Sequence, residues 1–396
     1  MRIGMLLDAV FPPDPRVENE ALTLVKAGHE VFLFCLHYGE QLENESIKGI
    51  FIRRYLSSKL EYKLSALAYT LPFYKNSISK KINHFLEVNN IDSIHIHDIQ
   101  VAGAAFKANS ILNLPIVMDL HENRPEIMKF YPHLNKFPGK YVIKPSIWKF
   151  YEKKYIEQTK ATIVVTEEAK QDLLERCDVT KDQIVVVPNT VHRSFYKEAV
   201  YNIDIENKYQ NDFVLLYLGD TGLRRGLMTA IESISTLVKK IKNIKLVIVG
   251  VSSTDFILKE KVRALHIEKY VDFEGWKDVS LFPSYIKSST ICISPLHKNK
   301  HHDTTYANKI FQYMSLGKPL LISDVDAQKN IIKRAVSGLV HKAKDKADFT
   351  DKVLEMFANT DLVDRYGVNG KEFIENEFTW EQTSKNLVHL YNKLEV

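Results

Sequence analysis

The sequence predicts an α/β protein made of two successive doubly wound domains, and three observations support this prediction. Short apolar runs alternate along the chain with longer amphipathic segments. The alternation stops at a polar stretch in the middle of the chain and then starts again. The length of 396 residues is sufficient for two domains of ordinary size. Because strands buried on both faces are apolar almost throughout, the pattern is typical of parallel sheets with helices on both faces.

In the first half of the chain, the apolar runs are the expected strands. They cover residues 3–7, 31–35, 94–97, 116–119, 163–166 and 184–187. The expected helices are the segments between them that have apolar residues at helical spacing, namely 17–27, 79–89, 101–108 and 146–158.

The second half repeats the pattern. Its expected strands are 214–218, 245–249, 271–274, 291–294 and 319–322. Its expected helices are 227–240, 255–265 and 305–316. The stretch 195–212 is polar and has no clear periodicity, so we place the domain boundary there, with domains 1–200 and 201–379. The last segment, 380–396, has an apolar helical face that must dock on another part of the protein.

The composition excludes several classes of protein. With 45% hydrophobic and 26% charged residues, the chain is neither disordered nor fibrous. Only 12 of the 54 basic residues are Arg, whereas a nucleic-acid-binding protein would favour Arg, so we expect no nucleic-acid partner. The three Cys are widely spaced, which predicts reduced thiols in a cytoplasmic protein and neither a disulfide framework nor a zinc site. No apolar run approaches 18 residues, so we expect no transmembrane helix.

The segment YLGDTGLRRG, residues 217–226, lies between an expected strand and an expected helix. Its Gly residues permit a tight turn, and the helix that begins near Gly226 offers free N–H groups to an anion. Arg224 and Arg225 stand at that helix start, so the segment would suit a diphosphate. The alternative is an ordinary strand–helix turn with two solvated arginines.

A second polar cluster precedes the expected helix 305–316. It contains Asp303, Thr304, Thr305, Asn308 and Lys309. Lys309 and Gln312 are three residues apart and would share one helix face. In the alternative interpretation, Thr304 or Thr305 is simply the N-cap of the helix.

The ordered set of motifs resembles glycosyltransferase family 4. In the C-terminal half the motifs are LGDTGLRRG, LVIVG, FEGW and ANKIFQYMSLGKPLLISD. In the N-terminal half they are FPPDPRVENEALTLVKAGHEV, IHIHD, MDLHENRPEI and VVVPNTV. The segment FTWEQTSKNLVHLYNKL is similar to the closing helix of that family. The similarity covers nearly the whole chain in the right order.

The resemblance implies a GT-B type fold, in which two Rossmann-like domains face each other across a cleft and the last helix returns to the first domain. It implies retaining transfer of a sugar from a nucleotide-diphosphate donor, without a metal or other cofactor. The acceptor would be a saccharide or a lipid-linked saccharide in the synthesis of a cell-surface polysaccharide or glycan. Two alternatives remain open: an isomerase similar to sugar-nucleotide 2-epimerases, and a catalytically silent partner of another transferase.

The resemblance also assigns roles on the donor side. His121, Arg225 and Lys309 are the expected catalytic residues, with His121 facing the transferred sugar. The diphosphate would be bound by Gly222, Arg224, Arg225, Gly226 and Lys309. The ribose and sugar would be met by Asp303, Thr304, Thr305, Asn308 and Gln312. Four positions depart from the family pattern: Thr304 and Gln312 replace a pair of Glu, Asp220 replaces an Arg, and Arg225 replaces a Lys.

On the acceptor side, the expected residues lie in two loops. Glu122 and Arg124 follow the strand 116–119, and Asp14 and Arg16 lie in the first loop. Side chains just beyond strand ends are where an open α/β sheet binds ligands. The alternative for the first pair is a helix-capping segment with Asn123 as the N-cap.

Two stretches of the first half are basic and aromatic. Residues 53–81 and 129–155 each contain seven basic residues and one acidic residue, a net charge of +6. Lys with aromatic residues suits an anionic membrane surface, so we expect a cytoplasmic protein with an option for peripheral attachment at the inner face of the membrane. The alternative is a set of helices that bury their aromatic residues and expose Lys.

His95 and His97 alternate on an expected strand and therefore point the same way. They could form a metal pair, but the sequence places no third ligand near them, so we favour a structural role. We expect no metal site.

Overall fold

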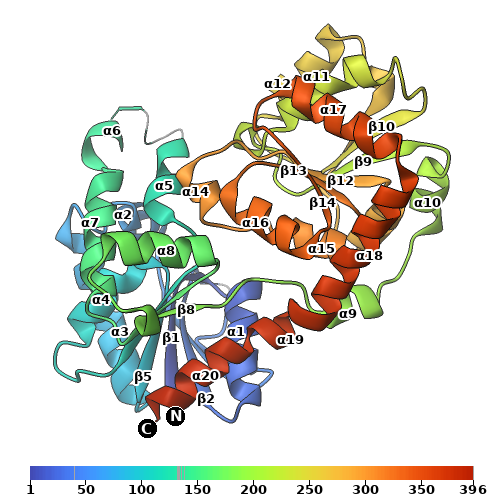
Figure 1. Ribbon diagram of the computed structural model, residues 1–396. Helices are drawn as coiled ribbons and strands as arrows, with labels where there is room; N and C mark the ends of the chain where they lie inside the picture. Colours follow the sequence, from blue (N-terminus) through green and yellow to red (C-terminus); the bar gives the residue numbers. More distant parts are fainter. Residues whose placement is uncertain (40, 132–133, 135, 138, 396) are drawn as a thin grey trace. The chain divides into compact units, whose positions relative to one another are not determined.

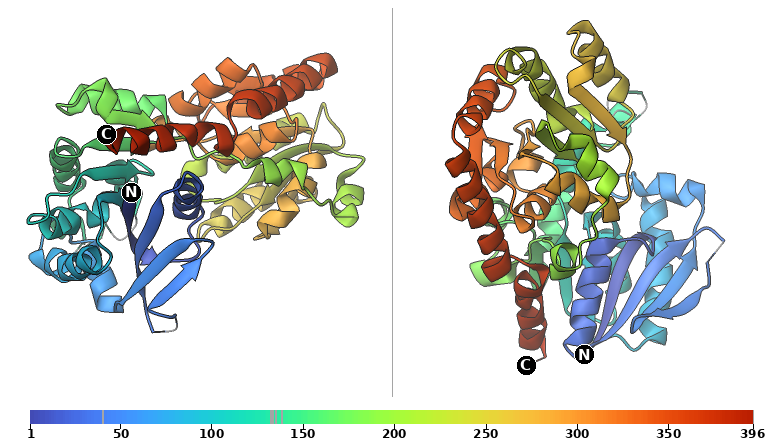
Figure 2. Two further views of the ribbon diagram at one scale, coloured as in Figure 1. Left: turned by 90° about the horizontal axis from the view of Figure 1, so that it is seen from below. Right: turned by 90° about the vertical axis from the view of Figure 1, so that its right-hand side faces the viewer.

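The computed structural model describes residues 1–39, 41–131, 134, 136–137 and 139–395. The chain divides into two compact units. Unit 1 is Met1–Pro188 with Ser384–Val396, and unit 2 is Asn189–Thr383. Each is a sheet with helices on both faces (Figures 1 and 2), which confirms the predicted α/β class and the two Rossmann-like domains.

The sheet of unit 1 has the strand order β3-β4-β2-β1-β5-β6-β7-β8. Its strands are β1 (Arg2–Val10), β2 (Glu30–His37), β3 (Asn44–Ile47), β4 (Ile50–Leu56), β5 (Ser93–His97), β6 (Ile116–Leu120), β7 (Ala161–Val164) and β8 (Ile184–Val186). Neighbouring strands run parallel, except that β3 pairs antiparallel with β4. The carboxyl ends of the parallel strands therefore meet at one edge.

The helices of unit 1 cover both faces of this sheet (Figure 1). They are α1 (Pro15–Lys26), α2 (Lys59–Ser65), α3 (Pro72–Val88), α4 (Ile99–Ala108), α5 (Arg124–Ile127), α6 (Gly139–Val142), α7 (Pro145–Ile156), α8 (Glu167–Arg176) and α20 (Lys385–Leu394). Residues of α3, α4 and α7 share one apolar cluster with Ile94, Ile96 and Met118 of the sheet. Helices α1 and α20 contact each other away from that cluster.

Helix α20 belongs to unit 1 although it lies at the end of the sequence. Leu387 and Tyr391 are fully buried there, and α20 contacts both α1 and β8. The apolar helical face expected within 380–396 is thus docked on the first unit. Val396 of that predicted segment lies outside the described residues.

The sheet of unit 2 has the order β11-β10-β9-β12-β13-β14, and all its pairs are parallel. Its strands are β9 (Phe213–Leu218), β10 (Ile244–Val249), β11 (Val271–Gly275), β12 (Ile291–Ser294), β13 (Leu320–Ser323) and β14 (Gly338–His341). Alternate residues of β9 enter two separate cores: Leu216 and Leu218 lie in one, and Leu215 and Tyr217 in the other.

The helices of unit 2 pack against these two cores. They are α9 (Arg193–Lys197), α10 (Ile203–Tyr209), α11 (Leu227–Leu237), α12 (Asp255–Ala264), α13 (Phe282–Lys287), α14 (Lys300–Asp303), α15 (Lys309–Ser315), α16 (Asp326–Ala335), α17 (Lys346–Phe357), α18 (Thr360–Glu377) and α19 (Trp380–Thr383). Residues of α11, α12 and α17 share one core, and residues of α13, α15, α16 and α18 share the other.

Several boundaries differ from the predictions. The chain changes units between Pro188 and Asn189, earlier than the predicted 200/201, because the polar stretch 195–212 forms most of α9 and α10, which belong to unit 2. Strands β3, β4 and β14 were not predicted. In β4, Arg53 and Arg54 hide the strand pattern, although Arg54 is buried and paired with Glu45.

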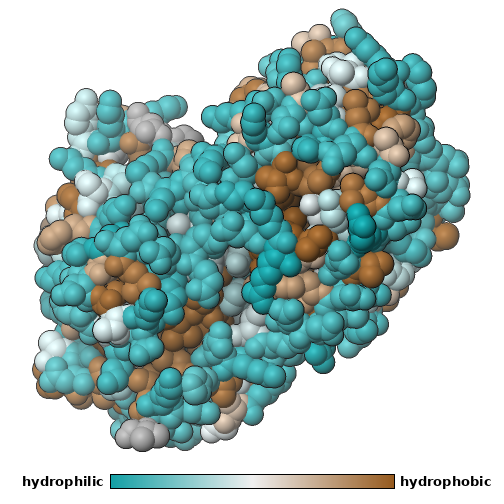
Figure 3. All heavy atoms as spheres, in the orientation of Figure 1, coloured by the Kyte–Doolittle hydropathy of each residue, from teal (hydrophilic) through white to brown (hydrophobic). Residues whose placement is uncertain are grey.

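The basic and aromatic stretches 53–81 and 129–155 fit neither interpretation completely. Tyr74, Trp148 and Tyr155 are buried, as expected for helices that turn their aromatic residues inward. The exposed aromatic residues are Tyr62, Phe73, Phe130, Phe137, Tyr141 and Phe150. Residues 132, 133, 135 and 138 of the second stretch lie outside the described residues. On the face drawn in Figure 3, hydrophilic residues predominate and apolar ones gather in patches.

The docking of α20 can be tested with Leu387→Ala. Removing this fully buried side chain leaves a cavity, so we expect the free energy of unfolding to fall by about 2–5 kcal/mol. Urea-induced unfolding measures the change. The exposed His389 on the same helix gives the control, because His389→Ala should alter stability by less than about 0.5 kcal/mol. Equal effects of the two substitutions would contradict the docking.

Candidate functional site

The loop between β9 and α11 in unit 2 is held in a tight conformation by glycine. Gly219 and Gly226 have φ angles of 105° and 78°, a region that residues with a Cβ rarely adopt. A Cβ at Gly226 would lie 1.7 Å from the carbonyl oxygen of Pro295. The loop therefore approaches the neighbouring backbone as only glycine permits, and α11 begins without a side-chain cap.

Asp220 organises this loop from within. Its carboxylate accepts a hydrogen bond from the Gly222 N–H at 3.0 Å and one from Nε of Arg225 at 3.0 Å, and it lies 3.8 Å from Nη2 of Arg224. Burial would raise the pKa of Asp220, but these donors and cations lower it. The Tyr217 hydroxyl donates to the Asp220 carbonyl at 2.6 Å. Asp220, which the sequence marks only as a departure from the family pattern, thus holds both Arg224 and Arg225 at the loop.

The side chain of Lys309 also reaches this loop. Its Nζ is buried, lies 3.4 Å from the centroid of the Tyr217 ring and has no hydrogen-bond partner among the described residues. A Cβ on Gly219 would lie only 3.5 Å from it. Burial and then the charge of Arg225 hold the pKa of Lys309 well below its ordinary value, although Asp220 opposes them. Protonating a buried amine without a partner is costly, and a bound anion would offset that cost.

Two buried histidines lie beside the arginines. Burial, followed by the charges of neighbouring residues that include Arg224 and Arg225, lowers the pKa of His301 to about 3. Burial also lowers the pKa of His302 to about 4. A neutral His302 ring can donate from Nδ1 to the His297 carbonyl at 2.7 Å and accept at Nε2 from Arg224 at 3.4 Å. The histidines therefore add no positive charge at neutral pH.

The residues predicted to meet ribose and sugar are largely occupied locally. The Asp303 carboxylate accepts from the N–H of Asp326 at 3.1 Å. The hydroxyls of Thr304 and Thr305 both donate to the backbone carbonyl of His301, which lies in the preceding helix α14. Neither Thr is an N-cap, so that alternative is wrong, and these back-bonds accompany the later start of α15 at Lys309.

Asn308 and Gln312 remain available. Asn308 is exposed at the N-cap position of α15 and makes no capping hydrogen bond with its side chain. Gln312 is half-buried, and its backbone carbonyl accepts a hydrogen bond from the Ser315 hydroxyl. Lys309 and Gln312 lie on the same helix, three residues apart, as predicted.

Unit 1 contains a buried charge network at the carboxyl ends of β5 and β6. Arg16 on α1 donates through Nη2 to Asp119 at 2.8 Å and through Nε at 3.2 Å, which is a bidentate pair. Nη2 also lies 2.8 Å from the carboxylate of Glu20, and Nη1 donates to the Val187 carbonyl at 3.3 Å. Arg16 is thus a buried structural centre and does not face solvent, contrary to its expected acceptor-side role.

His121 lies at the outer end of this network. Its Nε2 is 2.7 Å from the carboxylate of Asp119, and its backbone N–H donates to Asp98 at 3.3 Å. Burial would lower the pKa of His121, but the carboxylates of Asp119 and then Asp98 raise it to about 9. The ring is therefore an imidazolium at neutral pH. Burial together with the charge of His95 lowers the pKa of neighbouring His97 to about 3, so that ring is neutral.

The inner end of the network reaches α20. Nδ1 of His95 lies 2.9 Å from the Tyr391 hydroxyl, and its Nε2 lies 3.3 Å from Glu20. The rings of His95 and His97 stack at 4.5 Å, so they do point the same way. The imidazolium at His121 is therefore connected through Asp119 and His95 to the last helix.

The absence of a third ligand near His95 and His97 was a wrong expectation. Donor atoms of Glu20, His95, His97 and Asp119 lie within 4.8 Å of one another, a set that could bind a metal ion. However, the guanidinium of Arg16 already contacts both carboxylates. Its positive charge stands where a metal ion would have to bind, which favours the structural role for the two histidines.

Of the other residues predicted on the acceptor side, Asp14 has a structural role, whereas Glu122 and Arg124 lie together after β6. Asp14 is the N-cap of α1 and accepts from the Val17 N–H at 3.1 Å, a structural role. Glu122 and Arg124 lie together after β6, with Nη1 of Arg124 3.4 Å from Glu122. Nη2 of Arg124 donates to Gln100 at 2.8 Å. Asn123 occupies the N-cap position of α5 but makes no capping hydrogen bond with its side chain.

Sequence reasoning overlooked four important residues. Glu20 and Asp119 appear within predicted elements as ordinary polar positions, and Tyr391 as part of an apolar helix face. Tyr217 appeared only as the first residue of a glycine motif. The available signal was a charged residue inside a strand with apolar neighbours on both sides, since such a residue must be paired when buried. Asp119 in IVMDL satisfies that description.

Among the described residues, no helix is long and apolar enough to cross a membrane.

Comparison with known proteins assigns both halves of the chain. Residues 16–195 match the family model described as Glycosyltransferase Family 4, and residues 202–373 match that described as Glycosyl transferases group 1. An uncharacterized glycosyltransferase of Methanocaldococcus jannaschii is 25% identical over 96% of this chain and 93% of its own length. The phosphatidyl-myo-inositol mannosyltransferase of Mycobacterium leprae is 19% identical over 80% of this chain and 78% of its own.

Solved structures show the same fold. Sucrose-phosphate synthase from Thermosynechococcus elongatus aligns with a TM-score of 0.79 at 15% identity, over 99% of this chain and 98% of that one. Anabaena HepE in complex with UDP-glucose aligns with a TM-score of 0.71 at 12% identity, over 99% of this chain and 100% of that one. Together, the matching models and the shared architecture show that the chain belongs to the family 4 glycosyltransferases of the GT-B fold.

Proposed function

We propose that this glycosyltransferase moves a sugar from a nucleoside-diphosphate donor to a saccharide or lipid-linked saccharide, with retention of the anomeric configuration. The observation that carries the donor assignment is the buried, unpartnered Nζ of Lys309 beside the Gly219–Gly226 loop. Arg225, which uses Nε to hold Asp220, lies at the same loop. Two cations at a glycine loop that leads into a helix N-terminus suit a diphosphate.

The same groups would assist bond cleavage. Negative charge grows on the β-phosphate as the glycosidic oxygen of the donor departs, and catalysis requires groups that stabilise this charge more than that of the bound substrate. Lys309 and Arg225, which lie at the same loop, would supply this stabilisation. We propose that they, and not a divalent metal ion, neutralise the leaving diphosphate.

Retention does not require a protein nucleophile in this proposal. The acceptor hydroxyl attacks on the face from which the diphosphate leaves, and a phosphate oxygen takes its proton. The replacement of two family carboxylates by Thr304 and Gln312 is then compatible with activity. Gln312 and Asn308 offer neutral hydrogen bonds to the donor, which are weaker than those of a carboxylate.

Two comparisons narrow the candidate substrates. HepE was solved with UDP-glucose, so UDP-sugars are the first donors to examine. The mycobacterial relative is named for a phosphatidyl-myo-inositol acceptor, which favours an acceptor carried on a lipid. We therefore propose action at the inner face of a membrane in the synthesis of a cell-surface glycan, with the basic segments 53–81 and 129–155 facing the anionic lipids.

The proposal is tested by a thermal-shift screen of nucleotide-sugars, since a ligand that binds the native state raises its melting temperature. A stabilising donor is then incubated with lipid-linked and free saccharide acceptors. The expected result is a glycosylated acceptor and free nucleoside diphosphate. A new nucleotide-sugar formed without any acceptor would instead identify an isomerase, and binding without turnover on any acceptor would identify a silent partner.

The substitution Lys309→Met should weaken binding of the nucleotide-sugar without lowering the stability of the protein. We expect the affinity for the nucleotide-sugar to fall about tenfold to a hundredfold, because a charge-assisted hydrogen bond contributes about 1.5–3 kcal/mol. The variant should nevertheless unfold at the same temperature or higher, because a buried amino group without a hydrogen-bond partner among the described residues is replaced by an apolar group of similar length. Calorimetric titration and thermal unfolding measure the two quantities. Lys239→Met, at an exposed position near the end of α11, should change neither.

The protonation of His121 should make both stability and kcat/KM depend on pH. Its pKa is raised from 6.5 to about 9, so the stability contributed by its pairing with Asp119 is complete below about pH 6.5 and is lost as the pH rises through about 9. If the imidazolium binds a substrate hydroxyl, the pH profile of kcat/KM should have an alkaline limb that falls over the same pH range. His121→Gln should remove that limb, whereas the exposed His389→Gln should keep it. An NMR titration of His121 with a pKa near 6.5 would contradict the assignment.

A further inference from the structure

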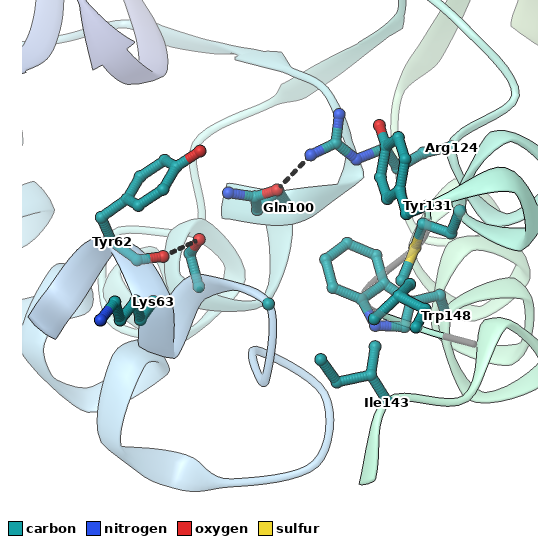
Figure 4. A pocket seen from close by; sticks show the side chains of 11 residues that line it. Tyr62, Lys63, Gln100, Arg124, Tyr131, Ile143 and Trp148 are labelled. Atoms are coloured by element: carbon teal, nitrogen blue, oxygen red, sulfur yellow. Dashed lines mark hydrogen bonds between the residues drawn. The ribbon is translucent and has the colours of Figure 1, made fainter. Parts of the chain in front are cut away.

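A pocket of about 420 Å³ in unit 1 is not used by the network around Arg16. It is lined on one side by α2, with Tyr62 and Lys63, and on the other by Tyr131, Ile143 and Trp148 (Figure 4). The first group belongs to the segment 53–81 and the second to 129–155. The two basic and aromatic segments, which are separate in sequence, therefore meet at one pocket.

The wall of this pocket is mostly apolar, and among the described residues Trp148 supplies an unsatisfied donor there. Ala66, Met128, Ile143 and the ring of Trp148 line its wall. Trp148 is only 1% exposed, yet its Nε1 has no hydrogen-bond partner among the described residues. The volume is within the range of about 300–1,000 Å³ that is usual for small-molecule sites.

The polar end of the pocket is formed by Arg124 and Gln100 (Figure 4). Nη2 of Arg124 donates to Gln100, which donates in turn to Asp8 at 2.6 Å, so the guanidinium is held in place. Nη1 lies 3.4 Å from Glu122, whereas Nε is buried without a partner among the described residues. Burial raises the pKa of Asp8 to about 6, and the carboxylates of Asp98 and Glu122 face Arg124.

We propose that this pocket binds a lipid phosphate that carries the acceptor, with the hydrocarbon chain along Trp148 and Ile143 and the phosphate at Arg124. This proposal rests on the proposed transfer to a lipid-linked acceptor. The charge of the two segments, +6 each, is complementary to a phosphate. A free saccharide fits less well, because its hydroxyls would face an apolar wall without partners.

The test uses calorimetric titration of the full chain with octyl phosphate below its micelle concentration. Octanol and inorganic phosphate are the comparison ligands. We expect one octyl phosphate to bind, octanol to bind about tenfold more weakly because it lacks the charge-assisted hydrogen bonds, and inorganic phosphate not to bind at this site. Equal affinity for octanol and octyl phosphate would overturn the assigned phosphate subsite, and no binding of octyl phosphate would overturn the proposal.

Two variants localise the binding. Ala66→Phe fills the pocket and should weaken octyl phosphate by at least about tenfold, as steric exclusion of a buried chain requires. Arg124→Gln should weaken octyl phosphate several-fold and leave octanol unchanged. The matched controls are Ala199→Phe and Arg365→Gln in unit 2, which should bind octyl phosphate like the unaltered chain. If Ala66→Phe does not fold, the contrast of octyl phosphate with octanol in Arg124→Gln decides alone.

The outcome is distinguishable from failure of the proposed function. Nucleotide-sugar binding is measured in the same preparations and depends on Lys309 and Arg225 of unit 2. Donor binding without octyl phosphate binding would leave the transferase proposal and overturn the pocket. Octyl phosphate binding that Ala66→Phe removes, in a chain that binds no nucleotide-sugar, would support the pocket and overturn the donor assignment. Octyl phosphate binding that neither pocket variant changes would place it elsewhere on the chain and overturn the pocket.

Discussion

Parallel strand pairing is the constraint on which the rest of both units depends. Apart from the pair β3–β4, every strand pair runs parallel, so the connections must cross from one end of the sheet to the other and helices cover both faces. Parallel pairing also gathers the carboxyl ends of the strands at one edge of each sheet. Asp119 and the glycine loop after β9 both lie at such ends. The chemistry of each unit is thus placed by strand direction before any side chain is considered.

The two units treat buried charge in opposite ways. In unit 1, Arg16 is matched internally by Asp119 and Glu20, and the network is completed by side chains of three histidines and Tyr391. Such a closed set fixes the orientation of its members. In unit 2, Lys309 is left without a partner among the described residues. A buried basic group without a partner costs stability, and in our proposal a bound diphosphate offsets that cost.

The sequence predicted the fold well because hydrophobic periodicity and element order are local properties. The apolar runs at 94–97, 116–119 and 214–218 correspond to β5, β6 and β9. It failed where tertiary pairing overrides local pattern. Arg54 in β4 reads as a surface residue but is buried against Glu45, and the polar stretch 195–212 folds largely because Phe195 and Ile205 pack on unit 2.

The candidate site was predictable only in part, for a related reason. The glycine loop with Arg224 and Arg225 is contiguous, and Lys309 is marked by its motif. The contacts of Asp119 with Arg16 and His121 join three separate segments, and the pocket at Trp148 joins two others. Spacing along one chain does not specify such encounters. Asp220 lies within the contiguous loop, but only its contacts in the structure show that it holds the loop together.

The place of α20 has a consequence for biosynthesis. Unit 1 is discontinuous, because Ser384–Glu395 complete a domain that begins at Met1. At a translation rate of about 5–20 residues per second, the ribosome needs roughly 10–40 s to make unit 2 before these residues emerge. During that interval the face of α1 that receives α20, and the ring of His95 that meets Tyr391, are uncovered. The nascent N-terminal domain therefore lacks its last helix for that interval.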